Sequence, residues 1–205
     1  MPLNRQYTLS AGFAIVALTM VEMFTIPRSY FVLGSLVSTS CMLLVSLLMT
    51  RYSTLFSATA KTVGVGILTA FLLYLVFLGG NALLKSYSPL GVGASNENSI
   101  YSLFASTPID LKMVVFALDA IGFESFFRGT LQRSLAPKLG SSSAFIVALI
   151  DAAIHISTFN PLFSITTFIA DGAWGINYYY TRDLYSNIAS HFLWDVLIFV
   201  LLPIS

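Results

Sequence analysis

Long uninterrupted apolar runs are the feature of this sequence that most restricts its fold. Because a helix rises about 1.5 Å per residue, about 20 apolar residues cross the roughly 30 Å hydrocarbon layer of a bilayer. About seven stretches meet that rule, at residues 8–27, 30–50, 62–84, 111–132, 142–159, 162–181 and 185–203. The runs are continuous and do not alternate between polar and apolar residues, which favours helices over a transmembrane barrel. We therefore predict an all-α, polytopic transmembrane helical bundle.

Composition agrees with a membrane location. Of the 205 residues, 57% are hydrophobic and 9% are charged, whereas soluble domains carry about 25% charged residues. Ten Lys and Arg residues balance nine Asp and Glu residues, so there is no basic surface for a nucleic-acid backbone. The single cysteine, Cys41, can form neither an intrachain disulfide nor a cysteine-type metal cluster. We expect an integral membrane protein with lipid as a partner, and we exclude nucleic-acid binding.

One polar segment divides the chain. Between Lys85 and Asp110 the sequence is rich in Ser, Asn, Gly and Pro and has no regular period, which indicates a loop. We assign residues 1–85 to an N-terminal three-helix membrane segment, residues 86–110 to a polar connecting loop, and residues 111–205 to a four-helix core.

Positive charges in the short connections favour one orientation. Arg5, Arg51, Lys61, Arg133, Lys138 and Arg182 fall on one side, and Arg28, Lys85 and Lys112 fall on the other. Because connections rich in Lys and Arg stay in the cytoplasm, we predict a multi-pass protein of the cell (plasma) membrane with a cytoplasmic N-terminus. The first stretch is long and lacks a clear small-residue cleavage site, so we expect it to be a retained helix.

Ionisable residues are concentrated in the last four stretches. These stretches contain Asp119, Glu124, Arg128, Asp151, His155, Asp171, His191 and Asp195. Each such residue at bilayer depth costs roughly 2.5–3.5 kcal/mol on insertion scales, so a cluster requires mutual pairing or a water-filled cavity. We predict one polar site within the last four helices. For Asp171, lining the cavity and a packing or hydrogen-bonding role are equally good interpretations.

Three pairs with a four-residue spacing suggest what the site does. They are Glu124 with Arg128, Asp151 with His155, and His191 with Asp195, and this spacing places both members on one helix face. A carboxylate and a neutral imidazole that share a water can remove its proton, and a second imidazole can donate to the oxyanion formed when that water attacks an amide. The pairs therefore favour peptide hydrolysis. No G-x-S-x-G or H-E-x-x-H motif supports a serine or zinc peptidase.

Other functions remain open for the same residues. The ion pair of Glu124 and Arg128, taken alone, is equally well explained as a structural pair. Intramembrane histidines also form interhelical hydrogen bonds. Buried acids and histidines serve as proton relays in small proton-coupled transporters, which is our third functional alternative.

Three motifs resemble those of a known family. The sequence ESFFRGTLQ that begins at Glu124, His155 within an apolar stretch, and HFLWD from His191 to Asp195 resemble the CPBP family in order and spacing. This is the CAAX protease and bacteriocin-processing group, also called Abi, with the pattern EExxxR, FxxxH and HxxxN or HxxxD. The resemblance covers residues 111–203 and implies an intramembrane endopeptidase. Such a hydrolase acts on a membrane-associated peptide, for example a prenylated C-terminus or a leader peptide.

The chain departs from the family pattern at two positions. Phe123 stands where the family has the first Glu, which acts on water together with the second-motif His. Asp151 stands where FxxxH has its Phe. We hypothesise that Asp151 supplies the missing carboxylate, either by orienting His155 or by acting on water itself, and that Asp119 is a second substitute. The alternative is a catalytically inactive relative that works as an immunity or peptide-binding membrane protein.

The predicted site therefore has the following members. The catalytic candidates are Glu124, Asp151, His155, His191 and Asp195, and Arg128 and Asp119 are structural or orienting candidates. The resemblance places His191 and Asp195 on the oxyanion side, where an ionised Asp195 cannot donate and is expected to hold His191. We expect no cofactor. A divalent metal is the less favoured alternative, with His155, His191 and Glu124 as its ligands.

Overall fold

The computed structural model of the protein describes residues 5–25, 27–50, 59–87 and 100–204. Every regular element in those residues is a helix, which confirms the all-α fold class. The first helices are α1 (Arg5–Thr25), α2 (Phe31–Met49) and α3 (Ala60–Tyr87). Next, α5 (Ile109–Phe123) continues through a π-helical segment (Glu124–Gln132) into α6 (Arg133–Leu139). The last are α7 (Ser142–Ile154) with a 3-10 turn (His155–Thr158), α8 (Pro161–Thr181), and α9 (Leu184–Val196) with a second π-helical segment (Leu197–Leu201).

Among the described residues, three helices are long and apolar enough to cross a membrane, judged by length and composition. They are Phe31–Met49, Ala60–Ser86 and Leu184–Leu201. These candidates support an integral membrane protein. The other apolar stretches also lie in helices, but seven spans, the plasma membrane and the orientation stay predictions. Of the connecting loop expected at residues 86–110, residues 88–99 lie outside the described residues.

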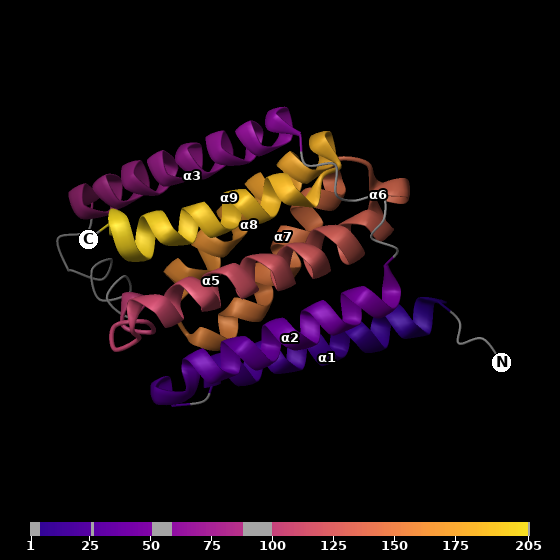
Figure 1. Ribbon diagram of the computed structural model, residues 1–205, viewed down its shortest axis with the longest axis horizontal. Coiled ribbons are helices and arrows are strands. Elements are labelled where there is room, and N and C mark those ends of the chain that lie inside the picture. The colour runs from indigo at the N-terminus through magenta and orange to yellow at the C-terminus, as the bar shows by residue number, and fades with distance from the viewer. Residues whose placement is uncertain (1–4, 26, 51–58, 88–99, 205) are drawn as a thin grey trace.

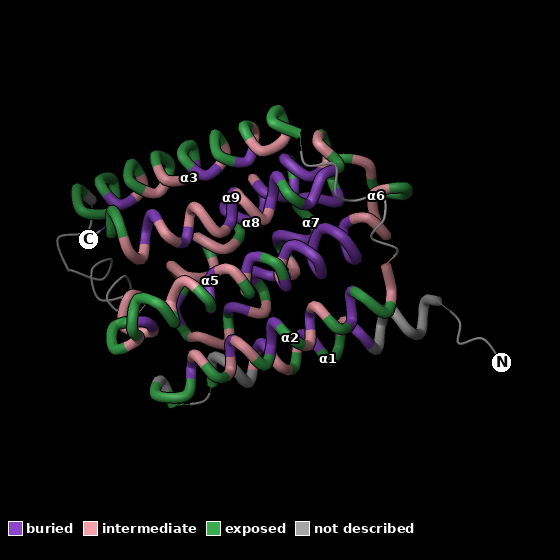
Figure 2. The backbone as a smooth tube through the Cα atoms, in the orientation of Figure 1, coloured by how far each residue is buried: buried purple, intermediate pink, exposed green. Residues whose placement is uncertain are grey.

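The first three helices flank the later ones on two sides. Figure 1 shows α1 and α2 side by side along one side of the bundle and α3 on the opposite side, next to α9. Between them, α5 packs on α2 and α9, and α7 packs on α8. Figure 2 shows buried residues gathered on the inner helices, whereas α3 is exposed along much of its length. The division into residues 1–85 and 111–205 stays a prediction.

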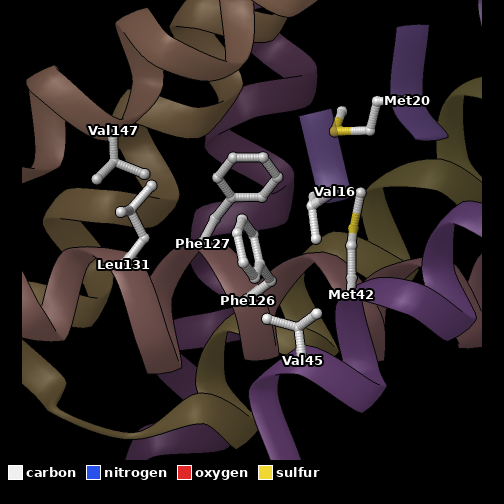
Figure 3. Packing of buried hydrophobic residues seen from close by; sticks show 8 residues of the cluster. All are labelled: Val16, Met20, Met42, Val45, Phe126, Phe127, Leu131 and Val147. Carbon is white, nitrogen blue, oxygen red and sulfur yellow. The ribbon is translucent and has the colours of Figure 1, made fainter. Parts of the chain in front are cut away.

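A hydrophobic cluster fixes the π-helical segment that carries the first motif. Phe126 and Phe127 are almost completely buried. Figure 3 shows these two rings among the other side chains of the cluster, which are Val16, Met20, Met42, Val45, Leu131 and Val147. Because α1, α2 and α7 all contribute to this cluster, the segment from Glu124 to Gln132 is held between three other helices.

A glycine brings α2 and α5 together just before the first motif. A Cβ atom on Gly122 would lie 2.5 Å from Thr39 Cγ2 and 2.9 Å from the Thr39 carbonyl oxygen. A larger residue would therefore push α5 away from α2. The close approach places Phe123 and Glu124 at a fixed distance from the N-terminal helices.

The chain turns tightly after His155. Phe159 adopts a left-handed conformation with φ of 53°. Asn160 then caps α8, because its side chain accepts a hydrogen bond from the Phe163 amide at 3.2 Å, and Pro161 occupies the first helical turn. The stretch expected to be helical over 142–159 is thus an α-helix only to Ile154, and His155 begins the 3-10 turn at its end.

Candidate active site

A cavity of about 730 Å³ lies between α3, α5, α8 and α9. Most of its wall is apolar. Its polar lining residues include Ser35, Asn81, Asp119, Asp151, His155, Asp171, His191 and Asp195. Both histidines thus face one cavity, as expected from the sequence. Glu124 and Arg128 are not among the lining residues and are completely buried behind the wall.

Glu124 is the centre of a polar group that we call the His191 cluster, which consists of Glu124, Arg128, Asn187, His191 and Asp195. One carboxylate oxygen of Glu124 lies 2.9 Å from His191 Nδ1. The other accepts a hydrogen bond from Asn187 Nδ2 at 3.0 Å and lies 3.3 Å from Arg128 Nε. Both oxygens are therefore engaged, and Glu124 orients His191 from behind the cavity wall.

Asn187 belongs to this cluster although no sequence motif marks it. Its amide bonds both Glu124 and, at 2.8 Å, the carbonyl oxygen of Trp174. It lies four residues before His191 on α9, so the spacing alone could have placed it on the same face. An asparagine in an apolar stretch carries little weight without the structure, because such residues commonly bond neighbouring helices.

The ring of His191 is held on its face as well as at its edge. It stacks on Trp174 with a centroid distance of 4.0 Å and an interplanar angle of 17°. Its Nε2 lies 3.7 Å from Asp195 Oδ2, which is beyond hydrogen-bonding distance. Because Nδ1 faces a carboxylate, Nδ1 carries the hydrogen in the neutral ring. Asp195 therefore acts on His191 through charge.

Arg128 links the first motif to α8. Its NH2 group donates to Asp171 Oδ1 at 2.7 Å and to the Asp171 carbonyl oxygen at 2.9 Å. The guanidinium also lies 5.8 Å from the centre of a Trp174 ring. The four-residue pair of Glu124 and Arg128 is therefore part of a larger buried network, and Asp171 joins the site through its carboxylate.

The second polar group, which we call the His155 cluster, consists of Asp151, His155 and Asp171. His155 Nδ1 lies 2.9 Å from the carbonyl oxygen of Asp151 and 3.4 Å from its Oδ1. A carbonyl oxygen can only accept, so Nδ1 donates and the neutral ring carries its lone pair on Nε2. The centroids of the Phe163 ring and the imidazole lie 4.9 Å apart, with the ring planes at 67°. The helix end thus fixes both the tautomer and the orientation of a potential general base.

The N-terminal helix α2 contributes partners that the sequence did not reveal. Asp119 accepts hydrogen bonds from Ser35 at 2.7 and 2.8 Å, and from Thr39. Serine and threonine are common in apolar helices, so no sequence signal marked these two. The prediction of a site confined to the last four helices is corrected on this point, because α2 and α3 supply part of the cavity wall.

Phe123 lies in the cavity wall beside His191. It stacks on Phe127 at a centroid distance of 5.7 Å, and its ring meets His191 edge-on at 5.9 Å. This position faces the cavity. An apolar ring therefore stands where the family pattern has a carboxylate, whereas Asp151 brings a carboxylate to the cavity from α7.

The described residues offer no preformed set of ligands for a metal ion. Within the described ranges, no group of three His, Cys, Asp or Glu side chains is arranged to hold a metal ion. Of the three ligands considered, Glu124 and His191 bind each other through Oε1 and Nδ1, and His155 Nδ1 is bonded to a backbone carbonyl. The absence of a cofactor stays a prediction.

Comparison with known proteins assigns the part of the chain that holds these clusters. Residues 106–197 match the family model described as Type II CAAX prenyl endopeptidase Rce1-like. The matched segment runs from just before α5 to the end of α9, so it includes every candidate catalytic residue. No curated protein and no solved structure matches the chain. Over residues 106–197 the chain therefore carries a domain of the Rce1-like type II CAAX prenyl endopeptidase family, which confirms the CPBP resemblance of its motifs.

Proposed function

We propose that the protein is an intramembrane endopeptidase that hydrolyses a peptide bond of a membrane-associated peptide inside the cavity. The observation that carries the proposal is the fixed imidazole of His155, which lines an apolar cavity together with the carboxylate of Asp151. The family match supports a peptide or protein as the substrate. A prenylated C-terminus or a leader-type sequence is the substrate class that we propose.

The chemistry begins at the His155 cluster. Nε2 of His155 takes a proton from a water molecule, and the carboxylate of Asp151 stabilises the imidazolium that forms. The water oxygen adds to the peptide carbonyl carbon and gives a tetrahedral oxyanion. The C–N bond then breaks while His155 returns the proton to the leaving amine. The products are a carboxylic acid and an amine, so atoms and charge balance.

The His191 cluster stabilises the oxyanion. Because His191 Nδ1 is directed at Glu124, a donor on Nε2 requires a ring with hydrogen on both nitrogens. The carboxylates of Glu124 and Asp195 lie on either side of the ring and favour that positive charge. In this arrangement Glu124 and Asp195 act through His191, and Arg128 holds Glu124 in place.

A cleavage assay tests the proposal. The purified protein is reconstituted in liposomes with two quenched fluorescent probes, a farnesylated peptide with a CAAX terminus and a hydrophobic leader-type peptide. We expect the wild type to cleave at least one probe and His155→Ala to lower the rate about 10²–10⁴-fold, the range of general acid–base catalysis. The matched control is Leu149→Ala, because Leu149 lies on α7, which ends next to His155, and has 61% of its surface exposed.

Two outcomes contradict the proposal. Equal rates for the wild type and His155→Ala would show that the cavity histidine is not the base. A folded wild type that binds the probes without cleaving either one supports the inactive relative, an immunity or peptide-binding protein. That second function is favoured by one observation, the apolar Phe123 at the position of the first motif Glu.

A further inference from the structure

The ion pair with Arg128 uses only one of the two carboxylate oxygens of Asp171. Its Oδ1 accepts from Arg128, whereas its Oδ2 is buried and has no hydrogen-bond partner among the described residues. Asp151 Oδ1 is also buried, and it accepts no hydrogen bond from a described residue. Both side chains line the cavity, and the two residues are only 2% and 1% exposed. Two acidic groups are therefore poorly satisfied at one place.

The two carboxyl groups meet between α7 and α8. The two side chains interact where α7 packs on α8, and both are buried there. Two ionised carboxylates have no hydrogen to share, so their unbonded oxygens can bond each other only when one group carries a proton. Two buried like charges side by side also disfavour the state in which both groups are ionised. For both oxygens to be bonded, the pair therefore needs one proton.

The charge of the surroundings leads to the same requirement. The single guanidinium of Arg128 contacts Glu124 at 3.3 Å and Asp171 at 2.7 Å. Glu124 also faces His191, so among the described residues Arg128 is the one permanent cation close to both Asp151 and Asp171. Burying an unbalanced charge is costly, and a proton on the pair reduces the imbalance without moving any side chain.

The contacts also indicate which oxygen holds the proton. Asp171 Oδ1 already accepts from Arg128, so Oδ2 is the atom of Asp171 left to donate. The negative charge then rests on Asp151, whose Oδ1 lies 3.4 Å from His155 Nδ1. This is the arrangement that stabilises an imidazolium on His155.

We propose that Asp171 keeps a proton on Oδ2 and donates it to Asp151, so that the pair supplies a single carboxylate fixed beside His155. This carboxylate takes the place of the first Glu of the family motif, where the chain has Phe123. The catalytic meaning of the pair rests on the proposed function. Asp171 acts through Asp151 and is a positioning residue.

Substitutions at the two positions give opposite results if the pair works in this way. Asp171→Asn keeps an oxygen for Arg128 and an N–H group that donates to Asp151, so we expect kcat within about 3-fold of the wild type, on the isosteric roles of the two side chains. Asp171→Leu removes both contacts and lowers kcat by about 10–100-fold. Asp151→Asn removes the charge and lowers kcat by about 100-fold with little change in KM. Asp110→Asn, at an exposed carboxyl group on α5, is the control and leaves kcat unchanged.

Infrared spectroscopy tests the proton without relying on cleavage. A protonated carboxyl group has a C=O stretching band that a carboxylate lacks. We expect this band in the difference between the wild type and Asp171→Asn, and no such band in the difference between the wild type and Asp110→Asn. If the Leu variant does not fold, the Asn variant and this band still decide the question.

The outcomes separate the two proposals. An Asp171→Asn protein as slow as Asp171→Leu, a fully active Asp151→Asn protein, or the absence of the infrared band overturns the shared proton. The band together with a wild type that cleaves neither probe supports the proton pair and contradicts the peptidase.

Discussion

The two histidine clusters differ in how completely their carboxylate oxygens are bonded. In the His191 cluster both oxygens of Glu124 are engaged by His191, Asn187 and Arg128, and the imidazole is stacked on an indole. In the His155 cluster Asp151 and Asp171 each keep a buried oxygen without a hydrogen-bond donor among the described residues. Asn187 Oδ1 and the Nε and NH1 atoms of Arg128 are also buried without a partner among these residues. The contrast therefore concerns the acids: Glu124 has donors for both oxygens, whereas Asp151 and Asp171 do not.

This difference indicates which substitutions act mainly on stability and which act mainly on turnover. A buried carboxylate whose two oxygens both have donors holds the neighbouring helices together, and removing any one donor leaves it unsatisfied. A buried carboxyl pair that must share a proton beside a fixed imidazole costs stability, and such groups are typical of sites that act on a ligand. We infer that substitutions in the His191 cluster reduce stability first, and that substitutions in the His155 cluster reduce turnover first.

The largest expected effect is on stability, from Arg128→Met. This change leaves Glu124 and Asp171 buried without their cation, and breaking a buried ion pair from one side costs about 3–5 kcal/mol. We expect a clear drop in the thermal unfolding midpoint of the protein in detergent. Lys138→Met, at an exposed position of α6, is the control and leaves the midpoint unchanged. An unchanged midpoint for Arg128→Met would contradict a stabilising role for the His191 cluster.

Asn187→Ala tests the same cluster with a smaller change. Glu124 Oε2 and the Trp174 carbonyl oxygen lose their donor, and a buried polar group without a partner costs about 1–3 kcal/mol. We expect a lower unfolding midpoint, measured by tryptophan fluorescence. The drop in the midpoint is expected to be smaller than for Arg128→Met. A loss of turnover at full stability would instead place Asn187 among the reacting groups.

Moving a carboxylate from α7 to α5 tests the difference between the two clusters further. Phe123→Glu in the Asp151→Asn protein returns an acid to the position of the first family Glu, close to His191. We expect it to recover about 10-fold of the lost turnover, equivalent to about 1.4 kcal/mol of barrier. The measurement is kcat on the cleaved probe. No recovery would mean that only a carboxylate on α7 can serve His155.

The smallest expected effect is that of a chelator. Prolonged dialysis against EDTA is expected to leave kcat within about 2-fold, because the proposed base and oxyanion donor are side chains. Cleavage assays before and after dialysis measure the effect. A loss that added Zn²⁺ restores would contradict this and favour the metal alternative at His155, His191 and Glu124.

Sequence reasoning located the groups that follow a local rule. The spacing of Asp151 and His155 and of His191 and Asp195 placed each pair on one face, and the apolar context predicted that the ionisable residues would meet. The all-α class followed from the length of the apolar runs. These features depend on neighbours along the chain, so the sequence contains them.

The partners that the sequence did not reveal depend on packing between helices. Ser35 and Thr39 reach Asp119 only because Gly122 lets α2 approach α5. Asp171 meets Asp151 only because α8 turns back along α7 after the left-handed residue Phe159. No local pattern encodes such contacts, so Asp171 could not be assigned a role before the structure.

The π-helical segment from Glu124 to Gln132 makes the number of residues at the first motif critical. A π-helix closes its hydrogen bonds over five residues where an α-helix uses four, so a deletion after Arg128 leaves these wide turns one residue short. Because one residue turns a helix by roughly 100°, everything downstream would rotate by about a quarter of a turn if the turns kept their width. Gln132, whose amide bonds the Gly175 carbonyl oxygen at 2.7 Å, would lose that partner. The chain can thus exchange side chains here far more readily than it can change its length.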